Sequence, residues 1–334
     1  MTLPRGYGYP TAPSDRWKMI WMLMNHRAEP RRAYIEYRVT VDPSPGLTPV
    51  KPYWLSVVPC VSDPQYTVPG GRRRGATHSR SRTFAMPVSG RIVAVGGHLH
   101  GGGRRLVLSQ PGCGNRPLFV SKPTYAPAGD PLYRVKPLLH EPDPKDMSWF
   151  QSGTGWAVRK GDALRVSAEY DGHRPHMRVM GIAHVYVAPD PAPRPRCAPP
   201  PADAQVLGPD FAGRPSPPGV SITLASYDGR GVARPIRGPR GRFRRLRGGA
   251  RVVVRSFSFA PTNLSIPRGA SVRWTFKSAV QHDATLAHGP RGFAAPYSRR
   301  GATFRRRFEV AGEYRIYCSL HPVYMSQVIR VRRR

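Results

Sequence analysis

The stretch from Tyr314 to Met325 places the strongest constraint on how this chain can fold. It reads Tyr-Arg-Ile-Tyr-Cys-Ser-Leu-His-Pro-Val-Tyr-Met. Apolar residues alternate up to Cys318, which predicts a strand with a thiol at its end. A tight turn after that strand can return His321 and Met325 toward the sulfur. His282 lies far upstream, where a Trp/Phe strand runs into a polar loop, so the fold has to bring it back to Cys318.

These four side chains form a set of soft metal ligands. Two imidazoles and one thiolate in a trigonal arrangement, with a weak axial thioether, are the ligands of a blue-copper electron-transfer centre. Zinc sites use cysteine, histidine and carboxylates rather than methionine. A loop that holds its ligands in a fixed shape keeps the geometry similar in both oxidation states, which favours electron transfer over substrate chemistry. The alternative is that one Cys and two His are buried in a β-sandwich for packing alone.

Residues 250–334 resemble a cupredoxin of the plastocyanin type. The resemblance covers residues 254–274, the His282 loop, a strand at 301–308, Ala-Gly-Glu-Tyr at 311–314 and the ligand loop. It implies a Greek-key β-sandwich that carries type 1 copper, with the histidine of the ligand loop near the surface as the point of electron exchange. The residues that the resemblance assigns to copper are His282, Cys318, His321 and Met325.

Length and composition predict an all-β chain of two domains. A chain of 334 residues is long for one domain. Its 39 Pro and 34 Gly indicate many short turns, and no amphipathic helical period extends over four turns. Strands are expected at several places, among them residues 33–41. The predicted organisation is a flexible arm (1–16), a jelly-roll-like β-sandwich (17–189), a Pro-rich linker (190–219) and the cupredoxin domain (220–334).

A second candidate metal site lies in the first half of the chain. His98 and His100 end an apolar strand and precede three glycines. Alternation along a strand puts both imidazoles on one face, where they can reach a single ion. The glycines let the backbone turn close beside them. A hydrogen-bonded pair of surface histidines is the alternative. His140, His173 and His176 lie in Pro/Asp-rich loops and are expected to be exposed.

Residues 17–189 resemble the second half of peptidylglycine alpha-hydroxylating monooxygenase. The order is His-x-His, then Lys-Gly-Asp before a strand (160–162), then a strand that begins near Met180. The resemblance implies an oxygen-activating copper held by His98, His100 and Met180, and His184 lies on the same face as Met180. That family has a further copper domain, for which we find no counterpart in this sequence, and the cupredoxin domain would take its place as electron donor. Met180 is otherwise a core residue.

The charge of the chain is strongly positive. The formal net charge is +34, and only seven of the 53 basic residues are Lys. Such a surface attracts nucleic acid, an anionic membrane or wall polymer, or an acidic redox partner. The arginines are spread over nearly every segment without an aromatic-interleaved patch, which disfavours nucleic acid. The expected partners are a redox protein or a small-molecule reductant, with association to anionic surfaces as a further option. No stretch is long and apolar enough to predict a transmembrane segment.

Four cysteines bear on the compartment. Cys318 belongs to the metal loop, Cys60 and Cys113 can pair in the first half, and Cys197 stands alone in a Pro-rich segment, although sequence does not fix the connectivity. A disulfide would indicate an oxidising compartment. The run from Met19 to Met24 lacks the cleavage site of a secretory signal. Copper-thiolate chemistry nevertheless favours an extracytoplasmic location, secreted or at the cell surface.

Three functions are compatible with these patterns. The first is electron transfer through type 1 copper, with a second copper site in the N-terminal domain. The second is a copper-dependent monooxygenase or oxidase that reacts at the N-terminal site and receives electrons from the cupredoxin domain. The third is copper sequestration or surface adhesion, in which the metals are cargo or structural. We favour the first. Substrate, electron donor and electron acceptor leave no trace in the sequence.

Overall fold

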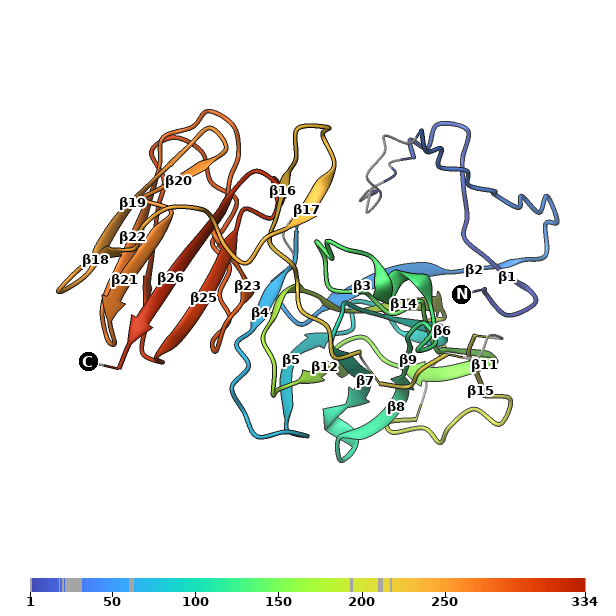
Figure 1. Ribbon diagram of the computed structural model, residues 1–334. Helices are drawn as coiled ribbons and strands as arrows, with labels where there is room; N and C mark the ends of the chain where they lie inside the picture. Colours follow the sequence, from blue (N-terminus) through green and yellow to red (C-terminus); the bar gives the residue numbers. More distant parts are fainter. Residues whose placement is uncertain are drawn as a thin grey trace.

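The computed structural model describes residues 2–17, 19, 21, 32–59, 63–192, 195–209, 213–216 and 218–333. Over these residues the regular structure consists of strands and two short 3₁₀ turns, η1 (Pro111–Cys113) and η2 (Pro131–Arg134). Four larger sheets form two β-sandwiches, one from each half of the chain (Figure 1). The predicted all-β class is therefore confirmed.

The first sandwich packs a five-stranded sheet against a four-stranded one. Leu164, Val166, Ala168 and Tyr170 alternate along one strand and are all fully buried between the sheets, as the period of a half-buried strand requires. The first sheet has the order β15 (Gln205–Leu207), β11 (Trp149–Val158), β6 (Gly90–Leu99), β14 (Gly181–Pro189), β3 (Lys51–Ser56). The second has the order β5 (Thr77–Ala85), β12 (Ala163–Asp171), β7 (Gly103–Gln110), β8 (Arg116–Ser121).

The second sandwich has the same two-layer plan. Trp274 is fully buried at its centre, and its indole nitrogen donates to the Gln327 side chain at 2.9 Å. One sheet has the order β18 (Arg244–Arg245), β21 (Asn263–Pro267), β26 (Ser326–Arg332), β25 (Gly312–Tyr317), β23 (Thr285–His288). The other has the order β20 (Ser258–Ala260), β19 (Ala250–Arg255), β22 (Ser271–Phe276), β24 (Thr303–Arg307). Pairs β21–β26 and β19–β22 are parallel.

Four short strand pairs complete the described structure. They are β1 (Tyr7–Gly8) with β2 (Thr48–Pro49), β9 (Pro123–Thr124) with β10 (Asp146–Met147), β4 (Tyr66–Val68) with β13 (His176–Val179), and β16 (Ala225–Tyr227) with β17 (Ala233–Pro235). Figure 1 shows β4 at the border between the two sandwiches. There the amide of Gly292 donates to the carbonyl of Pro69 at 2.9 Å, so the pair β4–β13 lies where the two halves of the chain meet.

Two sequence expectations about strands need comment. The strand predicted at 33–41 is wrong, because these residues are exposed and form no strand. Alternation alone cannot make a strand where no neighbouring strand accepts its hydrogen bonds. Within the predicted linker 190–219, residues Gln205–Leu207 form β15 and pair with β11 of the first sandwich. The domain boundaries themselves stay a prediction.

Candidate metal centre

The loop between β25 and β26 is closed by its own backbone. The amide of His321 donates to the carbonyl of Cys318 at 3.0 Å, and the amide of Met325 donates to the carbonyl of His321 at 3.1 Å. The amide of Cys318 donates back to the carbonyl of Met325 at 3.1 Å. These bonds turn the chain tightly after the strand, and they leave Cys318 and Met325 fully buried in the same core cluster.

His282 reaches this loop from the connection between β22 and β23, and β23 is the neighbour of β25. It follows β22, and its backbone forms an isolated bridge with Ser298, with N–O distances of 2.9 and 2.8 Å. The side chain is fully buried, and its Nε2 atom has no hydrogen-bond partner. The ring is therefore held by packing, and its Nδ1 atom faces the thiol of Cys318 at 3.8 Å.

The donor atoms of three predicted ligands converge. His282, Cys318 and His321 each offer one atom, and these atoms lie within 4.8 Å of one another. The Sγ of Cys318 lies 3.4 Å from Nδ1 of His321. Bonds of roughly 2.3 Å to sulfur and 2.0 Å to nitrogen at trigonal or tetrahedral angles would separate such donors by roughly 3.5 Å, so these residues fit one thiophilic ion. It is the one such group found among the described residues.

Burial sets the protonation of these groups when no ion is bound. Burial, with a contribution from the neighbouring Asp283 carboxylate, raises the pKa of the Cys318 thiol to about 12. Burial also lowers the pKa of His282, with a contribution from His321, and it lowers the pKa of His321 itself. Near neutral pH the thiol is then protonated and both imidazoles are neutral. A bound metal would reverse the state of the thiol, because coordination deprotonates it outright.

One edge of this group reaches the protein surface. His321 is half-buried, and the ring of Phe257 stands edge-on to it with centroids 4.9 Å apart. Phe257, Leu320 and Tyr324 are 46, 41 and 61% exposed. Large apolar side chains rarely gather at this exposure without a reason, and here they surround the most accessible imidazole.

A buried carboxylate that sequence reasoning missed organises the loop. Asp283 follows His282 directly and is fully buried. Its Oδ1 accepts the amide of Ser319 at 2.6 Å, and its Oδ2 accepts the hydroxyls of Ser319 at 2.8 Å and Thr285 at 2.5 Å. Because Ser319 follows Cys318, one side chain connects the backbone beside two predicted ligands. The sequence signal was only an acidic residue next to a histidine, which is common on surfaces.

The second predicted site lies on the outer face of the first sandwich. Leu99 is buried in the core, so His98 and His100 on either side of it point to the opposite face. Their Nε2 atoms are 3.2 Å apart. The hydroxyl of Tyr170 accepts the amide of His100 at 2.8 Å and donates to the carbonyl of Met180 at 2.5 Å. The backbones of the three predicted ligands are therefore adjacent.

A pocket of about 290 Å³ opens beside His98. His184 lines it, with its ring centroid 6.4 Å from that of His98. Burial, with a contribution from His100, lowers the pKa of His98 to about 4. Burial, with a contribution from His98, lowers the pKa of His184 to about 4 as well. Both imidazoles are then neutral at pH 7, the form in which histidine binds metal ions. The methionine among the lining residues is Met147 rather than Met180, and no sequence motif marked it.

His176 does not lie where it was predicted. It was expected to be exposed, yet it is fully buried, while His173 is exposed as predicted. The Nδ1 atom of His176 lies 2.9 Å from the Glu141 carboxylate, and its Nε2 atom lies 3.9 Å from Oδ2 of Asp171. A Cβ at Gly102 would come within 2.2 Å of this ring. The glycines after His100 thus make room for a buried ion network, as well as for the turn.

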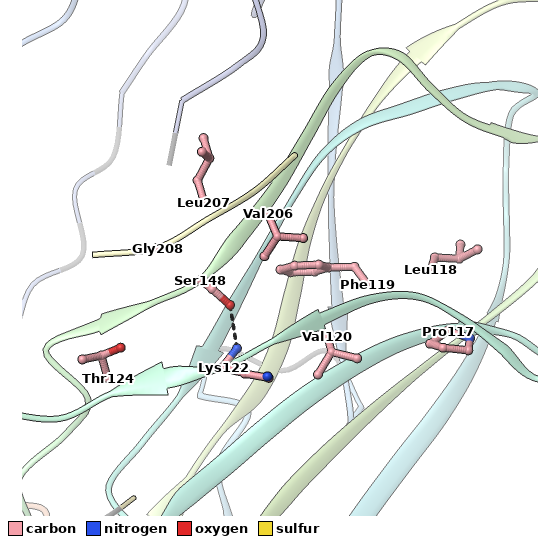
Figure 2. Close-up of a pocket in the computed structure, with 10 residues that line it drawn as sticks. All are labelled: Pro117, Leu118, Phe119, Val120, Lys122, Thr124, Ser148, Val206, Leu207 and Gly208. Atoms are coloured by element: carbon pink, nitrogen blue, oxygen red, sulfur yellow. Dashed lines mark hydrogen bonds between the residues drawn. The ribbon is translucent and has the colours of Figure 1, made fainter. Parts of the chain in front are cut away.

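Another pocket is separate from both histidine clusters. It has a volume of about 540 Å³ and lies between β8 and β15, with mainly apolar side chains such as Phe119 and Val206 around it (Figure 2). Lys122 is its one charged lining residue. Among the lining residues that the structure describes, no pair of groups is suited to acid–base or metal chemistry. Its shape is therefore the only feature that suggests a binding site.

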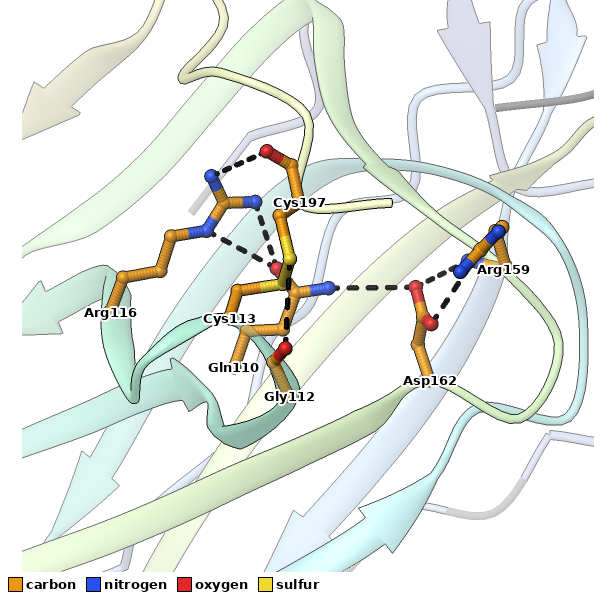
Figure 3. The surroundings of a disulfide bond; sticks show 7 residues. All are labelled: Gln110, Gly112, Cys113, Arg116, Arg159, Asp162 and Cys197. Atoms are coloured by element: carbon orange, nitrogen blue, oxygen red, sulfur yellow. Dashed lines mark hydrogen bonds and ion pairs between the residues drawn. A yellow bond between two sulfur atoms is a disulfide. The ribbon is translucent and has the colours of Figure 1, made fainter. Parts of the chain in front are cut away.

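The disulfide settles a connectivity that the sequence left open. Cys113 pairs with Cys197, 84 residues away (Figure 3), and not with Cys60, which was a possible partner. Cys60 itself lies outside the described residues. The bond joins η1 to the Pro-rich segment, and the guanidinium of Arg116 donates to the carbonyl of Cys197 at 3.1 Å. Two residues so far apart in sequence leave no local pattern, which is why the spacing of the cysteines did not indicate this pairing.

Comparison with known proteins finds similarity to solved structures over a quarter of the chain. No family model matches the sequence, and a search of curated proteins found no match. A purple cupredoxin from Nitrosopumilus maritimus is 28% identical over 25% of this chain and 99% of that chain, with a TM-score of 0.23. An oxidised amicyanin variant is 20% identical over 25% of this chain and 82% of its own, with a TM-score of 0.24. The similarity concerns a quarter of the chain, and its low TM-scores carry no argument about function.

Proposed function

We propose that this chain is a copper protein whose C-terminal sandwich transfers single electrons. The observation that carries the proposal is the convergence of one sulfur and two nitrogen donors from His282, Cys318 and His321 within 4.8 Å. Met325, fully buried beside Cys318, would supply the weak fourth ligand. When bound, copper supplies a one-electron couple between its two oxidation states.

The protein's own residues contribute a fixed and dry environment. The loop bonds from Cys318 to Met325 and the contacts of Asp283 hold the donors in position, which keeps structural change small when the charge of the site changes. Full burial of His282 and Cys318 excludes water. Half-buried His321 and the exposed side chains around it provide the contact for a redox partner. The charge of +34 favours an acidic partner.

Copper titration with visible spectroscopy tests this proposal. Adding one equivalent of Cu(II) to the full chain should produce an intense visible band from the thiolate–copper interaction. Cys318→Ser should abolish the band completely, since a hydroxyl does not provide a soft thiolate. His288→Ala is the matched control, because His288 is exposed and lies on β23 of the same sandwich, and it should keep the band. A band that survives in Cys318→Ser would contradict the proposal.

A second copper at His98 and His100 is supported by a separate observation. Their Nε2 atoms lie 3.2 Å apart beside an open pocket, and neutral imidazoles are good copper ligands. Met180 completes the proposed set. With this site the chain would bind two copper equivalents, and His98→Ala would bind one while keeping the visible band. A stoichiometry of one for the unmodified chain would rule out the second site.

The same site supports the alternative function of a copper-dependent monooxygenase or oxidase. An open pocket leaves a position at which a small molecule can approach the metal. Oxygen uptake that needs a reductant and disappears in His98→Ala would favour the enzyme. Oxygen uptake that is the same in the unmodified chain and in His98→Ala would leave electron transfer as the function.

The proposed location is outside the reducing cytoplasm. A disulfide between Cys113 and Cys197 is typical of oxidising compartments. Among the described residues, no helix is long and apolar enough to cross a membrane.

A further inference from the structure

One arginine of the first sandwich reaches the metal centre of the second. Arg178 lies on β13, and its Nη2 atom donates to Oδ2 of Asp283 at 2.6 Å and to the carbonyl of Ala295 at 2.8 Å. Its guanidinium also stacks over the ring of Tyr297, 4.0 Å from the centroid. Asp283 is the carboxylate that holds Ser319 beside Cys318. Two contacts therefore separate the first sandwich from the predicted thiolate ligand.

The charge of this arginine is needed where it lies. The Asp283 side chain is 0% exposed and that of Arg178 is 16% exposed. A buried carboxylate is costly unless a cation and hydrogen bonds compensate it. Among the described residues, Arg178 is the salt-bridge partner of Asp283. The first sandwich thus supplies the charge that lets a carboxylate sit behind the metal loop.

The strand that carries Arg178 is fixed from both sides. Val179 is buried in the first core, whereas Met177 packs against the second core and near Gly292. Arg178 between them has a φ of 54°, a left-handed conformation that non-glycine residues adopt only when their surroundings impose it. Neighbouring residues on one short strand are therefore anchored in different sandwiches, and Arg178 is held rigidly at the boundary.

We propose that Arg178 is a positioning residue through which the N-terminal sandwich sets the reduction potential of the copper centre. The inference rests on the proposed electron-transfer function and goes beyond it, because it assigns the first sandwich a role in that function without any metal of its own. Reduction adds one negative charge at the centre. A fixed guanidinium stabilises the reduced state relative to the oxidised one, and it also offsets the Asp283 carboxylate, which acts in the opposite direction.

The expected effects differ in sign between the two partners. Arg178→Met removes the cation but keeps an unbranched side chain at the strained φ, so the potential should fall. A tenfold change in the redox equilibrium corresponds to about 59 mV for one electron, and we expect at least this shift. Asp283→Asn removes the negative charge and should raise the potential. The double variant should lie between the two single variants, because the two charges shift the potential in opposite directions.

Redox titration of the visible band in the copper-loaded full chain measures these shifts. Arg291→Met is the matched control, because Arg291 also crosses between the halves, donating to the carbonyl of Gly70 at 2.6 Å, without an Asp283 contact. It should leave the potential unchanged. Arg178→Lys keeps the positive charge, so its reduction potential should stay closer to that of the unmodified chain than to that of Arg178→Met. A purely structural role of the planar guanidinium would not predict this result.

The outcomes separate this inference from the proposed function. If the unmodified chain shows no thiolate–copper band, the proposed function fails. If the band is present and Arg178→Met shifts the redox equilibrium by less than twofold, only the inference is overturned. The same holds if Arg291→Met shifts it as much as Arg178→Met. If Arg178→Met does not fold, a potential for Asp283→Asn at or below that of the unmodified chain overturns the inference by itself.

Discussion

The two histidine clusters differ in their surroundings more than in their residues. His282 is fully buried beside a thiol, in a loop closed by its own hydrogen bonds. His98 lies at the rim of a pocket of about 290 Å³ lined by polar groups such as Asp143. An enclosed donor set that includes sulfur favours a soft ion and rejects other ligands, whereas an open one leaves room for a small molecule. Imidazoles alone therefore do not define the chemistry of a site.

The two sandwiches are also secured in different ways. The first has a disulfide and a buried ion network around His176. The second ties its ligand loop through Asp283 to an arginine of the first. The first sandwich is thus stabilised by its own disulfide and ion pairs. The geometry of the metal loop, by contrast, depends on a contact between the two sandwiches. Variants that weaken the first sandwich alone can test whether this division holds.

Removing the disulfide should have the largest effect on stability. The Cys113–Cys197 bond spans 84 residues, and closing a loop of this length in the unfolded chain is worth about 4 to 5 kcal/mol in the chain-entropy model. The double change Cys113→Ser and Cys197→Ser should lower the free energy of unfolding of the first sandwich by about this amount. Urea denaturation followed by tryptophan fluorescence measures it, and the double change avoids leaving one free thiol.

The visible band of the copper-loaded double variant is the control for this comparison. It should keep its intensity in the absence of urea, because neither cysteine contacts the metal loop. If the band weakens in step with the first sandwich, the two sandwiches unfold as one unit and the division drawn above is wrong.

Sequence reasoning could place side chains near one another where they are close together in the chain, while their role as metal ligands stays a prediction. Cys318, His321 and Met325 lie on one loop, so their spacing carries the geometry, and the order of aromatic strands located His282. Alternation likewise placed His98 and His100 on one face. In each case the period of a strand or the length of a turn converts sequence distance into spatial distance.

Long-range partners could not be predicted in this way. Arg178 and Asp283 are 105 residues apart, and one arginine in a chain of net charge +34 has no distinguishing signal. The disulfide between Cys113 and Cys197 could not be predicted for the same reason. The strand expected at 33–41 had the right alternation but no neighbour to pair with, which is a property of the whole fold. The ion pair, the disulfide and the conformation of residues 33–41 all depend on tertiary partners and not on local sequence patterns.

The His176 network gives the smaller and last test of the comparison. Burial alone would lower the pKa of His176, but Asp171 and Glu141 outweigh it and raise the pKa to about 9. The folded protein therefore holds a proton that the unfolded chain, with a pKa near 6.5, releases earlier. The stabilisation is complete below about pH 6.5 and is lost as the pH rises through 9.

The loss over this range should be at most about 3 kcal/mol, since one pKa unit is worth 1.36 kcal/mol. Urea denaturation of the first sandwich at intervals between these two pH values measures it. His176→Gln cannot take up the proton, so its stability should be nearly independent of pH over the same range. The copper band of the second sandwich should not follow this titration in either chain. An equal pH dependence in His176→Gln would assign the effect to other groups and remove the ion network as a distinguishing feature of the first sandwich.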